Sequence, residues 1–189
     1  PQNPKTPQNG VAIIIMEKSQ PPKAHLLLFN IEKEHNFGRI VRSAAAFGLS
    51  ERMRFDLTVN EFTLELLNRN TLEVYDPDTW RPYCHVRDFA KIMMKVLETN
   101  SGVLNSEIFN CGSNSNNHTK RDIVNIIKSK IKNTNINFKS GDTDPRNYRV
   151  DFSKLKNFFL FSPNLSVEEG VQEIIDNFRL FSGKEKKFF

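Results

Sequence analysis

Two short stretches of the sequence place an arginine beside aromatic residues where a turn meets a predicted strand. One is Trp80-Arg81-Pro82-Tyr83, and the other is DTDPRNY, in which Arg146 lies near Tyr148. A guanidinium group can bind a phosphate through two parallel hydrogen bonds, and a neighbouring aromatic ring can stack on a base or cover a sugar face. Asn60 adds an amide on a predicted helix. These residues could bind a phosphorylated ligand; ordinary packing and surface roles are the alternative.

Several other kinds of chemistry lack their motifs. The eight glycines are too widely spaced for a GxGxxG or GxxGxxG loop, which would bring backbone close to a pyrophosphate. The sequence has no P-loop, no GxSxG nucleophile elbow and no HExxH or other metal-binding histidine spacing. The three tyrosines are followed four residues later by Thr79, Arg87 and Phe152, so none forms a Tyr-x-x-x-Lys pair.

The composition is that of an ordinary globular chain. With 38% hydrophobic and 26% charged residues, 189 residues suffice for one core. The net charge of +5 permits contact with phosphates without requiring nucleic acid. No apolar run approaches the roughly 18–20 residues of a membrane span, and the polar start does not have the layout of a signal peptide. Cys84 and Cys111 lie in separate strand-like segments, so we expect reduced cysteines and a cytoplasmic protein.

The hydrophobic pattern alternates between strand and helix, which predicts the α/β class. We expect helices over residues 37–47, 55–66 and 88–97, one opening with a capping box at Thr119, one near Ser153 and one capped by Ser166 and Glu169. Asp88 is expected to cap its helix. The predicted strands are VAIIIMEK, AHLLLFNI, LEVYD, RPYCHV, EIFNCG, NINFKSG and NYRVD.

Most of the chain resembles a known family. The blocks SERMRFDLTVNEF, LEVYDPDTWRPYCHVRDFAK, EIFNCGSNSNNHT, DPRNYRVDFSKL and FSPNLSVEEGVQEII occur in the order found in the C-terminal part of extended short-chain dehydrogenases, the NAD-dependent nucleotide-sugar epimerases and dehydratases. The likeness covers about residues 47–182. It implies that Asn60 contacts the substrate diphosphate and that Arg81 and Arg146 clamp it. Phe47, Gly48 and Ser50 match a loop after a strand, and His85, Val86 and Asp88 match the junction that frames the cofactor end.

The same resemblance implies what this chain lacks. The family's glycine-rich NAD loop, its acidic ribose-binding residue and its Tyr-x-x-x-Lys base belong upstream, where about fifty other residues stand. Hydride transfer needs a held nicotinamide and a positioned base. We therefore expect no cofactor to bind this chain alone, and no activity unless a homo-oligomer or a partner chain supplies the missing domain.

The first part of the chain resembles a different family. Residues 11–50 are similar to the start of SpoU-type RNA 2′-O-methyltransferases, whose motif is matched by Asn36, Gly38, Arg42, Phe47 and Gly48. This resemblance implies that Arg42, supported by Asn36, binds an RNA ribose and phosphate. The later motifs that bind S-adenosylmethionine are missing, so methyl transfer is not expected. A helix with a surface arginine is the alternative interpretation.

Together these patterns predict a partial Rossmann-type nucleotide-sugar epimerase C-terminal region with a short αβ N-terminal segment. The expected parts are a disordered lead over residues 1–10, a SpoU-like segment over 11–48, an epimerase-like substrate-binding region over 49–182 and a basic tail over 183–189. The primary functional hypothesis is binding of a nucleotide diphosphate sugar, with NAD as the family's cofactor. RNA binding is the second hypothesis, and a non-catalytic chimeric or truncated gene product is the third.

Overall fold

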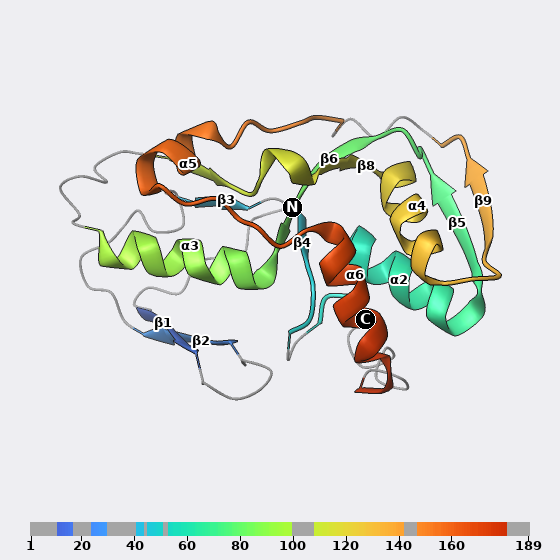
Figure 1. The fold of residues 1–189 in the computed structure, drawn as a ribbon, viewed down its shortest axis with the longest axis horizontal. Coiled ribbons are helices and arrows are strands. Elements are labelled where there is room, and N and C mark those ends of the chain that lie inside the picture. Colours follow the sequence, from blue (N-terminus) through green and yellow to red (C-terminus); the bar gives the residue numbers. More distant parts are fainter. Residues whose placement is uncertain are drawn as a thin grey trace, which may run out of the picture.

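The computed structural model describes residues 11–16, 24–29, 41–43, 45–50, 53–99, 108–141 and 147–180. Strands and helices alternate along this part of the chain (Figure 1). This alternation confirms the α/β class. The strands are β1 (Val11–Met16), β2 (Ala24–Phe29), β3 (Val41–Ser43), β4 (Ala45–Phe47), β5 (Thr71–Tyr75), β6 (Trp80–His85), β7 (Phe109–Cys111), β8 (Asn117–Thr119) and β9 (Asn135–Lys139). The helices are α2 (Thr58–Arg69), α3 (Val86–Glu98), α4 (Lys120–Lys130), α5 (Ser153–Phe159) and α6 (Val167–Asp176), with 3₁₀ turns at Asn114–Asn116 and Phe178–Leu180.

Parallel pairing between distant strands organises the sheets. β3 pairs with β7, and β4 pairs with β6, both in parallel. β6 also pairs with β8 in antiparallel orientation, and β5 pairs with β9 in parallel. Parallel pairs require long crossover connections, which helices provide here. β1 and β2 form a separate antiparallel ladder.

Residues 41–47 differ from the sequence prediction. The spacing of Ile40, Val41, Ala44 and Phe47 predicted a helix, which is wrong where the structure describes this segment, because 41–43 and 45–47 are strands. Their partners β7 and β6 lie 68 and 38 residues further on, as the pairs Val41–Phe109 and Phe47–His85 show. Distant pairing overrides the local pattern here. The strand predicted over NYRVD is also wrong, since residues 147–151 have no regular structure.

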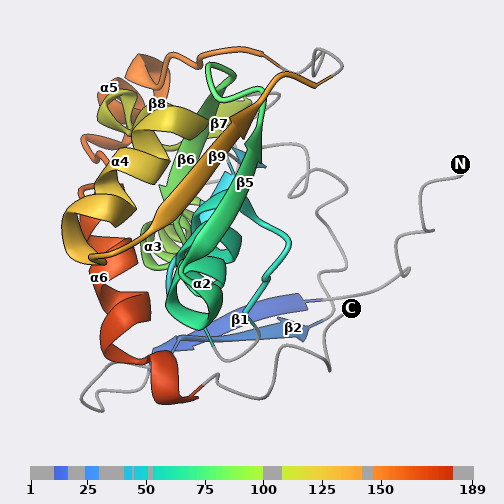
Figure 2. The ribbon, with the colours of Figure 1, turned by 90° about the vertical axis from the view of Figure 1, so that its right-hand side faces the viewer.

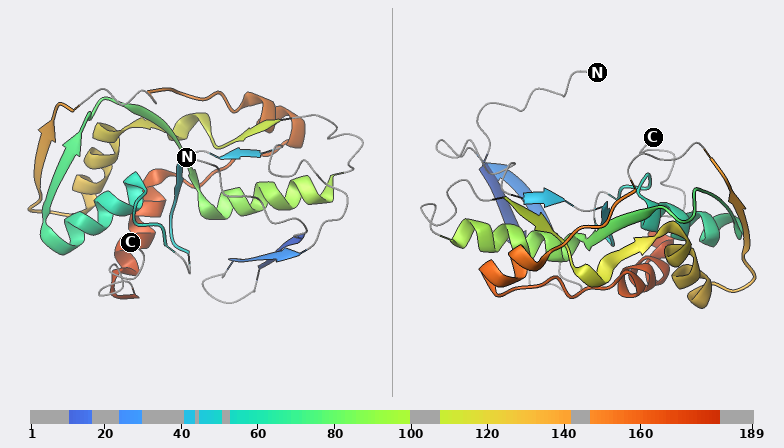
Figure 3. Two further views of the ribbon diagram at one scale, coloured as in Figure 1. Left: turned by 180° about the vertical axis from the view of Figure 1, so that it is seen from behind. Right: turned by 90° about the horizontal axis from the view of Figure 1, so that it is seen from above.

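The apolar faces of the helices form three neighbouring clusters. The first joins α2, α4 and α6 to β5 and β6, with Leu66, Tyr83 and Ile127 fully buried. The second joins α3, β6, β7 and α5 around Ile92 and Phe109, and the third joins α2 to α6. Figures 1 and 3 show α3 and α5 at one end of the molecule and α4, β5 and β9 at the other. Figure 2 shows α4 and α6 side by side.

Two of the three predicted helix caps are confirmed. Thr119 with Asp122, and Ser166 with Glu169, form reciprocal capping boxes at the starts of α4 and α6. The cap predicted at Asp88 is wrong: His85 is the N-cap of α3. The buried Asp88 carboxylate instead accepts hydrogen bonds from the backbone N–H groups of Asn164 and Leu165, which fixes the chain leading into α6. No helix within the described ranges has the length and apolarity needed to cross a membrane.

Candidate functional site

The loop after β4 is held by Asn60 on α2. The Asn60 side chain is 3% exposed; its Oδ1 accepts a hydrogen bond from the Gly48 backbone N–H at 3.1 Å, and its Nδ2 donates to the Arg54 carbonyl at 3.0 Å. Gly48 has φ 100°, a conformation that favours glycine. The amide therefore joins both ends of the loop to α2.

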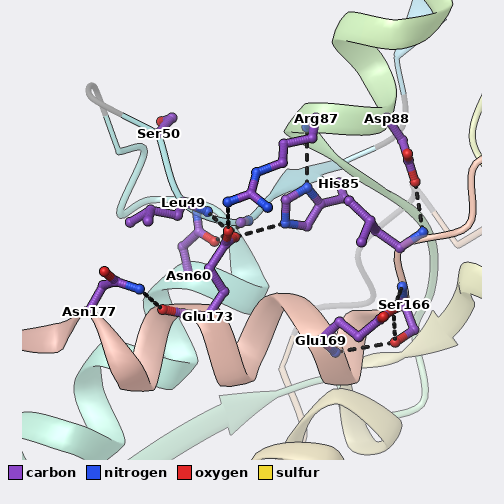
Figure 4. Close-up of polar contacts among 12 residues, drawn as sticks. Leu49, Ser50, Asn60, His85, Arg87, Asp88, Ser166, Glu169, Glu173 and Asn177 are labelled. Atoms are coloured by element: carbon purple, nitrogen blue, oxygen red, sulfur yellow. Dashed lines mark hydrogen bonds and ion pairs between the residues drawn. The ribbon is translucent and has the colours of Figure 1, made fainter. Parts of the chain in front are cut away.

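A second anchor comes from α6 (Figure 4). Glu173 Oε2 accepts a hydrogen bond from the Leu49 backbone N–H and lies 2.9 Å from His85 Nε2, while Oε1 pairs with the Arg87 guanidinium. His85 Nδ1 accepts a hydrogen bond from the Arg87 backbone N–H, so Nε2 carries the proton that faces Glu173. We call Leu49, His85, Arg87 and Glu173 the α6 anchor.

The charge of Glu173 is favoured by these partners. Burial alone would raise the pKa of its carboxyl, but the hydrogen bonds from His85 and Leu49 and the charge of Arg87 outweigh burial and hold the pKa below its ordinary value. An ionised carboxylate accepting three donors fixes the loop, the start of α3 and α6 relative to one another.

The chain at Trp80 and Arg81 lies beside Asn147 and Tyr148. The Trp80 backbone N–H donates to Asn147 Oδ1 at 3.0 Å, and the Tyr148 N–H donates to the Trp80 carbonyl at 3.3 Å. The Arg81 guanidinium lies 5.6 Å from the centre of the Tyr148 ring and also donates to the Trp80 carbonyl. Arg81 thus stands against an aromatic ring from the second segment. Arg146, directly before Asn147 in the sequence, lies outside the described residues.

A cavity of about 440 Å³ lies next to this pair of segments. Its lining residues are Trp80, Asn114, Asn117, Arg149, Val150 and Asp151. The Arg149 guanidinium stacks 3.7 Å from the centre of the Trp80 ring. Trp80 and Arg149 therefore both line this cavity and stack on each other, whereas Arg81 and Tyr148 are not among its lining residues.

The structure brings together only some of the predicted residues. Arg81 meets the segment that follows Arg146, whereas Asn60 is engaged with the β4 loop. Asn36 lies outside the described residues, and Arg42 lies on β3, where its backbone pairs with Asn110. The sequence suggested Tyr148 only as an aromatic neighbour of Arg146 that could stack on a base or cover a sugar face, and it gave Glu173 no role. Tyr148 stood within a quoted block, but Glu173 gave no local signal, because its partners are 86 to 124 residues away.

The described residues do not fit a dinucleotide loop. Such a loop needs glycines that leave space for a pyrophosphate. The four described glycines instead face protein atoms: a Cβ would meet the His85 ring at Gly48, Phe152 at Gly112, Asp76 at Gly141 and Phe47 at Gly170. These glycines allow close packing within the chain. We therefore derive no hydride-transfer step from the described residues.

Tyr83, buried in the core, is not activated as a base. Burial raises the pKa of the Tyr83 hydroxyl to about 12, although Thr58 and Arg81 act in the opposite direction. A phenol with this pKa is protonated at neutral pH and does not act as a base. In the described part of the chain, no group of three or more His, Cys, Asp or Glu side chains could hold a metal ion.

Comparison with known proteins identifies the relatives of this fold. The model of the NAD dependent epimerase/dehydratase family matches residues 24–112. The resemblance to nucleotide-sugar epimerases and dehydratases is confirmed. UDP-glucuronic acid decarboxylases 6 and 5 of Arabidopsis thaliana are each 29% identical, over 172 and 171 residues, which is 87% and 86% of this chain. The chain spans about half the length of these relatives, 48% in each case.

Solved structures of related enzymes share the fold. UDP-glucuronic acid 4-epimerase from Bacillus cereus, in complex with UDP-glucuronic acid and NAD, superposes with a TM-score of 0.65 and 23% identity over 75% of this chain and 45% of that chain. The NAD-dependent NDP-hexosamine 5,6-dehydratase TunA gives a TM-score of 0.63 and 19% identity over the same shares. These likenesses describe a Rossmann-type epimerase/dehydratase fold, part of which this chain forms.

Proposed function

We propose that this chain is the nucleotide-sugar-binding portion of an NAD-dependent epimerase/dehydratase. In this proposal Arg81 and Arg146 bind the diphosphate of a nucleotide diphosphate sugar. Asn60 stays in the proposed site, either by direct contact with the diphosphate or by holding the loop from Gly48 to Arg54 against α2.

One observation carries the proposal. Trp80, the neighbour of Arg81, is hydrogen-bonded to Asn147 and Tyr148, which directly follow Arg146 in the sequence. Two guanidinium groups on adjacent segments can bind a diphosphate from two directions, as bidentate recognition requires. The Tyr148 ring restricts the Arg81 side chain, which lowers the entropy lost on binding.

The enzymatic activity of the whole protein is also a proposal. The described glycines pack against protein atoms and do not fit a dinucleotide loop, so epimerisation or dehydration would need a cofactor-binding domain. We propose that a homo-oligomer or a partner chain supplies this domain where activity occurs, and that the protein acts in the cytoplasm. By itself the chain is expected to bind sugar nucleotides without converting them.

The RNA hypothesis has weaker support. The family match covers residues 24–112 and so spans the expected boundary between the SpoU-like segment (11–48) and the epimerase-like region (49–182). β3 and β4 also pair with β7 and β6, which lie within the epimerase-like region. Both observations favour one family on both sides of this boundary. Weaker RNA binding after Arg42→Ala, with strong salt dependence, would favour the second hypothesis instead.

Titration calorimetry of the purified chain with UDP-glucuronic acid and UDP-glucose tests the proposal. Arg81→Ala and Arg146→Ala should each raise Kd at least about tenfold, because a charge-assisted hydrogen bond contributes about 1.5–3 kcal/mol. NAD alone should give no heat.

Arg149→Ala is the matched control. Arg149 also stacks on an aromatic ring, that of Trp80, but it is not one of the two arginines proposed to bind the diphosphate, so its removal should change Kd less than about twofold. Equal losses for Arg81→Ala and Arg149→Ala, or no binding of either nucleotide by the unaltered chain, would reject the proposed site.

A further inference from the structure

The sequence contains two cysteines, and the fold brings both together. Cys84 on β6 and Cys111 on β7 are 27 residues apart, yet their Sγ atoms lie 3.7 Å from each other. Both thiols are free and nearly fully buried, with 1% and 0% exposure. Neither cysteine belongs to the proposed nucleotide-sugar site.

The surroundings hold this pair in place. Cys84 and Cys111 pack in one apolar cluster with Ile92, Phe109 and Leu155. Each lies on a strand that is paired with the segment 41–47: Cys84 opposite Ala46 and Cys111 opposite Ser43. The backbone pairing of each strand therefore fixes the two sulfur atoms at contact distance. Each thiol consequently experiences a high effective concentration of the other.

We propose that Cys84 and Cys111 form an intramolecular thiol–disulfide site that small-molecule disulfides oxidise. The Cys84 or Cys111 thiolate attacks one sulfur of the small disulfide, forming a mixed disulfide and releasing one small thiolate. The second cysteine then loses its proton and attacks the mixed disulfide. An Sγ–Sγ bond forms at about 2 Å, and the second small thiol leaves. Two thiol protons and two electrons pass from the protein to the small disulfide, which is reduced to two thiols.

The environment predicts slow oxidation with a stable product. The hydrogen bond with Cys84, together with burial, raises the pKa of the Cys111 thiol. The attacking thiolate is therefore scarce in the closed structure, and the first exchange step requires a local opening. The stability of the disulfide depends on the separation of the two sulfurs in the folded state. The property that distinguishes this site is therefore the equilibrium between the two thiols and the disulfide, and not the rate of oxidation.

The test is redox titration of the full chain in buffers of reduced and oxidised glutathione, followed to equilibrium from both directions. After alkylation in denaturant, peptide mass spectrometry should detect Cys84 joined to Cys111. The folded chain should hold this disulfide at least about tenfold more strongly than the same chain in guanidinium chloride, where only loop closure acts. By thermodynamic linkage the oxidised chain must then melt at a higher Tm than the reduced chain.

Cys84→Ser and Cys111→Ser are the matched variants. Each retains one thiol and should give neither the cross-linked peptide nor the rise in Tm. The proposal is overturned if the folded chain holds the disulfide no more strongly than the unfolded chain. It is also overturned if a mixed disulfide with glutathione or an intermolecular disulfide is the equilibrium product. Both readouts are independent of nucleotide-sugar binding.

Discussion

At the scale of single residues, Gly48 is the described glycine with the least room for a side chain. Its φ of 100° is strained for any L side chain, and a Cβ there would lie 2.2 Å from His85 Nε2. The His85 ring cannot move away easily, because it is buried and hydrogen-bonded to Glu173. We expect Gly48→Ala to lower the free energy of unfolding by about 3 kcal/mol, measured by urea denaturation monitored by circular dichroism.

Gly141→Ala is the control for this substitution. The nearest atom to a Cβ at Gly141 is Asp76 Oδ2 at 3.1 Å, at the end of a half-buried side chain that can shift by a few tenths of an ångström. The expected loss is below about 1 kcal/mol. If Gly48→Ala were no more destabilising than Gly141→Ala, the result would contradict tight packing of the β4 loop against the His85 ring.

At the scale of secondary-structure elements, the α6 anchor predicts a pH dependence. The pKa of Glu173 is lower in the folded chain than its ordinary value near 4.5. Ionisation therefore stabilises the fold above that ordinary value, and this contribution is lost as the pH falls through the lower folded pKa. Glu173→Gln removes the charge, so it should lower the free energy of unfolding by about 1–3 kcal/mol at pH 7. The same substitution should flatten the fall in Tm between roughly pH 5 and pH 3, where carboxyl groups titrate.

Glu168→Gln, on an exposed position of the same helix, is the comparison. It should change stability by less than about 0.5 kcal/mol and leave the acid slope as it is in the unaltered chain. If the two glutamine substitutions changed the stability equally at pH 7 and the acid slope of Tm equally, the α6 anchor would not hold α6 to the β4 loop.

The elements also show what the sequence could predict. α4 and α6 were predictable, because a capping box and an apolar stripe are local patterns, and both boxes are present. The strands at 41–47 were not, because a short run of small and β-branched residues fits either period and its partners lie far along the chain. Asn60 was selected from a resemblance, but its bonds to Gly48 and Arg54 depend on tertiary structure.

At the scale of the whole molecule, β6 links the two largest apolar clusters. Tyr83 belongs to the cluster formed with α2, α4 and α6, while the next residue, Cys84, belongs to the cluster formed with α3, β7 and α5. Neither cluster can come apart without exposing one face of the same strand. We therefore expect a single cooperative unfolding transition that involves both clusters.

Two core truncations, one in each cluster, test this coupling. Ile127→Ala on α4 and Ile92→Ala on α3 each remove a fully buried side chain, so each should lower the free energy of unfolding by about 3 kcal/mol. Leu97→Ala, at a position 42% exposed on α3, should cost less than about 1 kcal/mol. The single tryptophan, Trp80, begins β6, so its fluorescence and far-ultraviolet circular dichroism should give the same midpoint in every variant. If Ile92→Ala shifted only one of two resolved steps, the clusters would unfold separately, and β6 would not couple them.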